Sequence, residues 1–258
     1  MNTTSSRRVL IAGSAALFSV VFLTVCPGCA DEKPPASPVA TPLDPATFGG
    51  VKGMVRLNGP DPAPIPLAMG TDVCRDFPPP IDPARGLVKN GLVQNVFVRI
   101  TKGLEGKVFA RPETFVEIDQ RGCLFEPRVV GVRPGQYTVF KNSDPVVHNV
   151  RINAPKRGTN KTLPSKGTSF NWWFAEAGTD PVLLNCDVHP WMRGFLFVVD
   201  HPFFGTTGPD GDFAFANLPA GVYDFEGWSE VFGTATAKGV KVEPGQAAAV
   251  TLTFAAPK

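Results

Sequence analysis

Long stretches without proline or glycine are scarce in this chain of 258 residues, which contains 27 Pro and 26 Gly. A doubly wound α/β sheet or a helical bundle needs long helices, and long helices need runs that lack these turn-forming residues. The composition therefore argues against both architectures. Because 43% of the residues are hydrophobic and 20 are Phe, the chain can still build a core, and we expect an all-β protein.

An excess of charge of one sign is also missing. The formal net charge is +2, from 25 basic and 23 acidic residues. Arg7 and Arg8 belong to an N-terminal targeting segment, which leaves 23 residues of each sign in the rest of the chain. A neutral body lacks the basic surface that binds phosphates, so we expect no binding to nucleic acid.

Residues 1–29 have the pattern of an export signal. Arg7 and Arg8 precede an uncharged apolar run at residues 9–25, and Asp31 is the first acidic residue. This pattern predicts an exported protein of the periplasm or cell envelope. An uncleaved membrane anchor is the alternative, because a run of about 17 residues is the shortest that spans a bilayer.

Two cysteines at the end of this segment lie in sequences that resemble the lipid-attachment box of bacterial lipoproteins, namely Leu23-Thr24-Val25-Cys26 and Gly28-Cys29. This resemblance implies a membrane tether through a lipid-modified Cys26 or Cys29. Residues 30–47 contain five prolines and no hydrophobic period, which is typical of an extended tether. An unstructured mature N-terminus without a lipid is the alternative.

Short strand patterns recur throughout the rest of the chain. Apolar and polar side chains alternate most clearly at residues 51–57. Further strands are predicted at residues 93–100, 114–118, 137–141, 149–152, 170–174, 182–185 and 195–199. Short strands at this spacing predict a β-sandwich.

Residues 201–258 have a pattern of their own. The turn Pro209-Asp210-Gly211 leads into Phe213-Ala214-Phe215, and Leu218-Pro219-Ala220-Gly221 leads into Val222-Tyr223-Asp224-Phe225. Residues 240–242 and 250–254 are expected to form a hairpin around Pro244-Gly245. The stretch resembles the carboxypeptidase regulatory-like, or prealbumin-like, β-sandwich, which implies a scaffold and no chemistry.

Four strands are few for a sandwich, and residues 53–59 resemble the opening strand of the same family. Residues 48–111 are therefore expected to pair with residues 201–258 around an inserted domain. A contiguous module formed by residues 201–258 alone is the alternative, and the sequence leaves both arrangements open.

The most informative stretch brings a thiolate, an imidazole and a thioether together at the spacing CxxHxxM. It reads Cys186-Asp187-Val188-His189-Pro190-Trp191-Met192-Arg193-Gly194 and lies between two predicted strands. Soft sulfur with imidazole selects copper or zinc over magnesium or calcium, and two His, one Cys and a weak axial Met make a blue-copper site. A second His is expected at a neighbouring strand end upstream, where His148 fits.

These motifs resemble the cupredoxins, most closely the amicyanin-like branch. The matching segments are Phe125-Glu126-Pro127, Val132-Arg133-Pro134-Gly135, Asn142-Ser143-Asp144, His148-Asn149-Val150 and the CxxHPxMRG loop. The resemblance implies a Greek-key cupredoxin sandwich over residues 112–200 that binds one copper. The implied ligands are His148, Cys186, His189 and Met192.

The same resemblance implies roles for residues around the ligands. Asn149 would brace the ligand loop by hydrogen bonds, and such contacts fix ligand orientation. In cupredoxins an apolar patch around an exposed His edge is the docking face. This implies that His189 presents the exposed edge and that Pro190 and Trp191 contact a redox partner protein of unknown identity.

The function implied is an electron carrier that cycles Cu(II)/Cu(I), not an enzyme. The chain has only three His, at positions 148, 189 and 201, too few for the trinuclear cluster of a multicopper oxidase. Cys186 is the only Cys in the loop, which excludes a binuclear copper-A centre. A copper-binding or structural, partner-binding envelope module without redox turnover is the alternative. A zinc site is a further alternative, although Met is a poor zinc ligand. A buried Cys that binds no metal is another.

Two cysteines have no role in the signal or the metal site. They are Cys74 and Cys123. Outside the cytoplasm such residues usually pair, and a disulfide closing a loop of this size stabilises by about 3 to 4 kcal/mol. Two buried thiols are the alternative.

Overall fold

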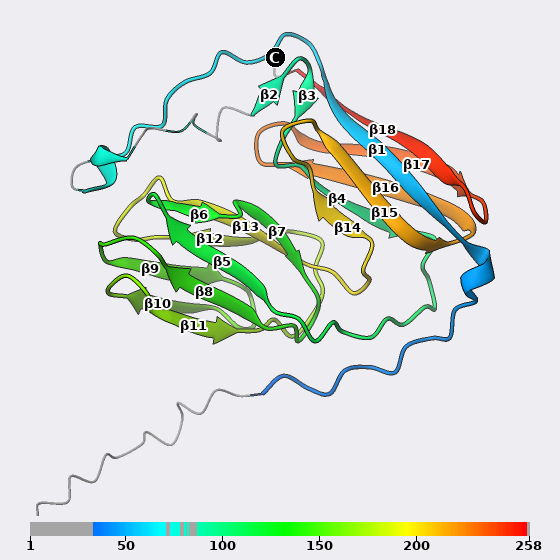
Figure 1. Cartoon of the computed structure of the whole chain (residues 1–258), viewed down its shortest axis with the longest axis horizontal. Helices are drawn as coiled ribbons and strands as arrows, with labels where there is room; N and C mark the ends of the chain where they lie inside the picture. The colour runs from blue at the N-terminus through cyan, green and yellow to red at the C-terminus, as the bar shows by residue number, and fades with distance from the viewer. Residues whose placement is uncertain (1–32, 71–72, 78–79, 81, 83–86, 257–258) are drawn as a thin grey trace, which may run out of the picture. The chain divides into compact units, whose positions relative to one another are not determined.

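The computed structural model describes residues 33–70, 73–77, 80, 82 and 87–256 (Figure 1). The predicted export signal, with Cys26 and Cys29, lies outside the described residues. Within the described part of the chain, no helix is long and apolar enough to cross a membrane. The helices described there are two short 3-10 helices, η1 (Pro45–Thr47) and η2 (Val73–Asp76). The rest is strands and loops, so the all-β prediction is confirmed.

One set of strands forms two sheets that share a core. The first sheet has the order β10-β9-β12-β13-β7 and the second the order β11-β8-β5-β6. Their bounds are β5 Val116–Arg121, β6 Leu124–Glu126, β7 Val129–Val132, β8 Thr138–Asn142, β9 His148–Asn153, β10 Thr159–Leu163, β11 Ser169–Trp172, β12 Val182–Asn185 and β13 Arg193–Val198. Two of the pairs, β5 with β8 and β7 with β13, are parallel.

The register of β9 against β12 places the predicted ligands at one end of the first sheet. The two strands are antiparallel, with Asn185 opposite Arg151. The start of β9 therefore lies beside the end of β12, where the ligand loop begins. Side chains alternate along a strand, and His148, Val150 and Ile152 are all buried.

The second set of strands also forms two sheets around a core. Their bounds are β1 Phe48–Asn58, β2 Val88–Lys89, β3 Leu92–Val93, β4 Phe97–Lys102, β14 Phe204–Thr206, β15 Asp212–Pro219, β16 Gly221–Ser229, β17 Gly233–Val242 and β18 Ala247–Ala255. Strand β1 pairs with β15 and β18, and β4 pairs with β14 and β16. Strands from residues 48–111 and 201–258 thus share both sheets, and Figure 1 shows β1 among β15 to β18. Their assignment to a prealbumin-like module stays a prediction.

Two local features explain the sequence motifs of this second set. A Cβ atom on Gly53 in β1 would lie 2.1 Å from the ring of Phe213, so the aromatic residue after the Asp-Gly turn needs glycine opposite it. The hydroxyl of Tyr223 donates to the carbonyl of Pro219 at 2.6 Å. This bond resembles the tyrosine corner of β-sandwiches, in which the hydroxyl ties a strand to the preceding turn.

The predicted hairpin of residues 240–242 with 250–254 is wrong. Strand β17 pairs with β16, whereas β18 crosses to the other sheet and runs parallel to β1. The pairing extends from Gly50 opposite Ala247 to Asn58 opposite Ala255. Alternate side chains of β18 are buried in the core, and this long pairing prevails over the local turn.

The predicted extended tether needs a correction over part of its length. The backbone N–H of Thr41 donates to the carbonyl of Val108 at 2.8 Å, and the N–H of Val108 donates back to the Thr41 hydroxyl at 2.9 Å. The N–H of Arg111 donates to the hydroxyl of Ser37 at 2.8 Å. Residues 37–41 are therefore attached to the strand-bearing part of the chain.

Candidate metal centre

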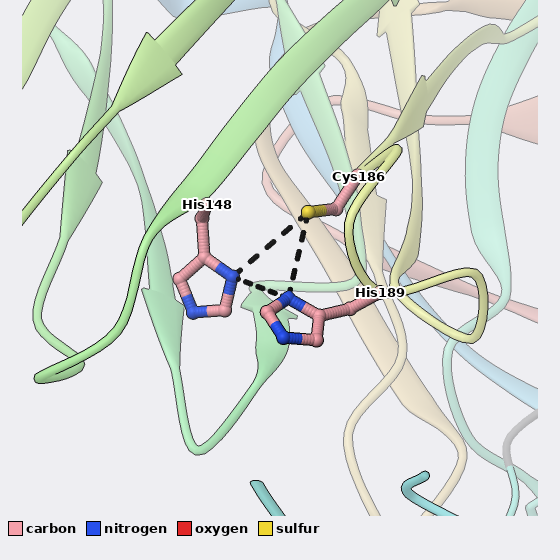
Figure 2. A group of neighbouring side chains, drawn as sticks. All are labelled: His148, Cys186 and His189. Carbon is pink, nitrogen blue, oxygen red and sulfur yellow. Dashed lines mark hydrogen bonds between the residues drawn. The ribbon is translucent and has the colours of Figure 1, made fainter. Parts of the chain in front are cut away.

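Three predicted ligands meet at the end of the first sheet. His148 is the first residue of β9, Cys186 follows β12 directly, and His189 lies in the loop to β13. The Nδ1 atoms of the two histidines are 2.9 Å apart. The Cys186 sulfur lies 3.9 Å from Nδ1 of His148 and 3.7 Å from Nδ1 of His189. Figure 2 shows these three atoms pointing toward one another.

The triangle formed by these atoms has the dimensions of a metal site. A point equidistant from all three corners lies about 2.1 Å from each, and metal bonds to nitrogen and sulfur are roughly 2.0 to 2.3 Å. Among the described residues, no further His, Cys, Asp or Glu atom joins this group. The donor set therefore fits a metal that takes two imidazoles and one thiolate.

Met192 lies in the same loop as Cys186 and His189. Its backbone N–H donates to the carbonyl of His189 at 2.9 Å, and its carbonyl accepts from the N–H of Cys186 at 3.3 Å. The two bonds close the loop on itself. The side chain of Met192 is completely buried in the same core cluster as Cys186.

The predicted exposed edge of His189 is wrong. His189 is only 2% exposed, and the ring of Trp191 lies beside it with 5.2 Å between the ring centres. Trp191 is half-buried and donates its indole N–H to the carbonyl of Cys123 at 3.1 Å. Pro190 is exposed. Docking of a partner on Pro190 and Trp191 stays a prediction.

Asp144 contacts the candidate metal centre, although the sequence motifs that include it did not predict this role. Its Oδ2 atom lies 3.0 Å from Nε2 of His148. Its two oxygens also accept the backbone N–H groups of Gly122 at 2.7 Å and Cys123 at 2.8 Å. A carboxylate on one imidazole nitrogen orients the other toward a metal. The signal was present in the sequence, because Asp144 ends the Asn-x-Asp turn four residues before His148.

A second network fixes the residue after Cys186. The Oδ1 atom of Asn149 accepts the backbone N–H of Asp187 at 2.7 Å and lies 3.4 Å from the Cys186 sulfur. The Asp187 carboxylate receives a two-pronged ion pair from Arg151, at 2.8 and 2.6 Å, and a hydrogen bond from Asn160 at 2.9 Å. The hydrogen bond from Arg151 is the main reason that the pKa of Asp187 falls to about 2.

The electrostatics of the site favour an ionised sulfur. Burial opposes ionisation of Cys186, but the hydrogen bond with His148 and bonds to the backbone of Asn149 in β9 and of the loop outweigh it, so the pKa of the thiol lies below its ordinary value. Burial likewise lowers the pKa of His148, and the contacts with Asp144 and Cys186 outweigh it and raise that pKa. Thiolate is the form of cysteine that binds metals.

The predicted disulfide between Cys74 and Cys123 is confirmed, with 5.7 Å between the Cα atoms. Cys123, Asp144 and His148 also lie close enough together to resemble a metal site. Because the sulfur of Cys123 is bonded to Cys74, this second group lacks a thiolate. Cys186 is the free cysteine of the described chain, and it is buried.

Comparison with known proteins found no matching family model and no matching curated protein. Among solved structures, an oxidised point mutant of amicyanin is 20% identical with a TM-score of 0.31, covering 39% of this chain and 92% of that one. A reduced Cu(I) form of another amicyanin mutant is 22% identical with a TM-score of 0.31, covering 40% and 98%. A purple cupredoxin from Nitrosopumilus maritimus is 20% identical with a TM-score of 0.28, covering 33% and 99%. Similarity at this level does not assign the chain to a family.

Proposed function

We propose that this protein is a one-copper electron carrier whose metal is held by His148, Cys186, His189 and Met192. The observation that carries the proposal is the triangle of two imidazole nitrogens and one sulfur, since these donors at these separations suit copper. The CxxHxxM spacing and the resemblance of the surrounding motifs to cupredoxins support the same reading.

Copper, when bound, supplies the Cu(II)/Cu(I) couple. The chain's own residues hold the donors in place before any metal arrives. Asp144 keeps Nε2 of His148 engaged and leaves Nδ1 for the metal, and the depressed pKa of Cys186 favours the thiolate. The backbone N–H of Cys186 donates to the carbonyl of Met192, and the N–H of Asp187 donates to Oδ1 of Asn149, so both bonds limit movement of the chain at Cys186. A site held this firmly rearranges little when its charge changes by one.

Copper is preferred over zinc on the chemistry of the donor set. Structural zinc sites are tetrahedral and take a fourth nitrogen, sulfur or oxygen ligand. The described part of the chain brings together three such donors, from His148, Cys186 and His189. Met192, which is buried in the same loop, is the candidate for a fourth ligand. A long, weak thioether bond completes a trigonal copper site, whereas zinc uses Met poorly.

We further propose that the protein works outside the cytoplasm with a redox partner protein. The apolar run after Arg7 and Arg8 supports export, and the disulfide is consistent with an oxidising compartment. A lipid on Cys26 or Cys29 would tether the protein to a membrane. Mass spectrometry of the mature N-terminus after expression in a bacterium with its export machinery tests the cleavage site and the lipid together.

The experiment that tests the main proposal is reconstitution of the metal-free chain with Cu(II). We expect one copper per chain and an intense visible absorption that bleaches with a reductant. Cys186→Ser should abolish the colour, because a hydroxyl is neither soft nor ionised at neutral pH. Copper binding without the colour, or colour retained in Cys186→Ser, would refute the electron-carrier assignment. The first result would favour a copper-binding or structural module.

A further inference from the structure

We propose that residues 65–70 and 73–77, here called the cover segment, close the metal centre and are held there by the Cys74–Cys123 disulfide. The inference rests on the proposed function and adds a property to it. A covered centre keeps its metal as a resident cofactor and excludes small external ligands. This separates an electron carrier from a protein that hands copper on.

The cover segment is packed into the core around the metal centre, although it belongs to the connection between β1 and β2. Leu67 and Met69 are buried while Ala68 and Gly70 between and after them are exposed, which is the alternation of an extended segment lying on a core. Leu67, Met69 and Cys74 belong to the same buried cluster as Cys186 and Met192.

The cover segment touches the ligand loop at Trp191. A Cβ atom on Gly70 would lie 2.8 Å from Cζ3 of the Trp191 ring, so the backbone of the cover segment rests directly on the indole. His189 also lies beside the indole, with 5.2 Å between the ring centres. Trp191 therefore contacts both the cover segment and His189, and His189 is 2% exposed.

Cys123 connects the disulfide to both histidines. Its backbone N–H donates at 2.8 Å to Oδ2 of Asp144, the atom that lies 3.0 Å from Nε2 of His148. Its carbonyl accepts the indole N–H of Trp191 at 3.1 Å, and Trp191 packs on His189. Its sulfur is bonded to Cys74 of the cover segment. One residue thus supports the cover segment and both imidazole ligands.

The backbone of Cys123 is set up for this role by a tight turn. Gly122 and Cys123 connect β5 to β6, where Arg121 pairs with Leu124, and both have positive φ angles of 61° and 57°. Two successive positive φ values are those of a type I′ hairpin turn. The turn directs both N–H groups at Asp144. A non-glycine residue in this conformation is uncommon, and here the cysteine is required for the bond to Cys74.

The test measures how accessible Cys186 is in the full-length, metal-free chain. The intact chain reacts with iodoacetamide, and mass spectrometry of the peptide that contains Cys186 gives the rate of alkylation. Two variants should open the centre: Cys74→Ala with Cys123→Ala, and Gly70→Val, which keeps the disulfide but collides with Trp191. Val73→Ser, an exposed position of the cover segment, is the matched control. We expect alkylation about tenfold faster or more in both opening variants, because reaction of a buried group follows the free energy of local opening, and no change in the control.

A second readout uses the Cu(II)-loaded protein and azide. The wild type and Val73→Ser should show no new absorption with azide, whereas both opening variants should show a new charge-transfer band. Near-ultraviolet circular dichroism identifies a variant that has merely unfolded. If the variant without the disulfide unfolds, Gly70→Val decides whether the cover segment closes the centre. Rapid alkylation of the wild type, or rates in both folded variants equal to the wild type, would overturn the inference. A chain that is never blue but shows the expected alkylation rates refutes the proposed function and leaves the cover segment standing.

Discussion

The carboxylate of Asp144 and the imidazole of His148 form a buried pair, with 3.0 Å between Oδ2 and Nε2 and side chains 3% and 0% exposed. Asp144 is itself held by two backbone N–H groups, from Gly122 and Cys123. Burial raises the pKa of Asp144, but the bonds from His148 and from these N–H groups outweigh it and hold that pKa below its ordinary value. The carboxylate is therefore a charged support that fixes which nitrogen of His148 faces Cys186 and His189.

Replacing this support should weaken copper binding. Asp144→Asn keeps the size of the side chain and removes its charge, so we expect a loss of about 10- to 100-fold in copper affinity, as is typical for outer partners of ligating histidines. Competition with a copper chelator measures the effect. Asp61→Asn is the matched control, because Asp61 also accepts two successive backbone N–H groups, from Asn90 and Gly91, away from the centre. Equal affinity of both variants and the wild type would show that Asp144 does not support the ligand.

Met192 should affect the reduction potential of the centre more than its copper content. The axial bond in a trigonal copper site is long and weak, so Met192→Leu should keep copper and colour. The reduction potential of this variant should rise, because Cu(II) is stabilised less when a sulfur donor is removed. His148→Ala deletes an equatorial ligand and should instead weaken copper binding. Copper content after dialysis compares the two variants, and equal losses would contradict the trigonal model.

The Arg151–Asp187 ion pair should set part of the reduction potential. Asp187 is adjacent to Cys186, and its charge is balanced by Arg151 at 2.6 Å. Arg151→Gln leaves a negative charge near the metal, which favours Cu(II) and lowers the potential. Asp187→Asn should raise it. Charges at such short range shift a potential on the order of tens of millivolts.

Redox titration of the copper-loaded proteins measures these shifts. Lys156→Gln is the control, since Lys156 pairs with Glu176 at 2.6 Å on an exposed surface. Shifts of the same sign in Arg151→Gln and Asp187→Asn would mean that loop distortion, and not charge, controls the potential.

His201 should make the stability of the protein depend on pH. It is buried beside β13, with Nε2 2.9 Å from the carbonyl of Ile100 and Nδ1 accepting the N–H of Phe203 at 3.2 Å. Only the neutral ring with its proton on Nε2 makes both bonds. Burial is the main cause that lowers the pKa of His201 below its ordinary value of 6.5.

The imidazole of His201 therefore takes up its second proton, at Nδ1, less readily in the folded state than in the unfolded state. The contribution of His201 to stability is complete above pH 6.5 and is lost as the pH falls from there through the lowered pKa. Urea unfolding of the metal-free chain at several pH values, in the wild type and in His201→Gln, measures it. The difference between the two free energies of unfolding should shrink as the pH falls, and curves that stay parallel would exclude a role for this proton.

The sequence by itself determined the class of fold and pointed to the side chains of the candidate metal centre. The spacing CxxHxxM places three candidate ligands within one loop, and local chain geometry brings Cys186 and His189 together. The abundance of proline and glycine leaves little room for anything but short strands. The pairing of Cys74 with Cys123 also followed from the sequence, because every other cysteine had a role elsewhere.

Only the tertiary structure decided what surrounds those ligands. Trp191 lies beside His189 and also meets Gly70, which is far away in the chain. The link from Cys123 through Asp144 to His148 depends on a turn between other strands. The pairing of β18 with β1, instead of with β17, was also decided only by the tertiary structure. An alternating pattern shows which side of a strand faces a core, but it does not specify which distant strand or segment completes that core, since many partners satisfy the same alternation.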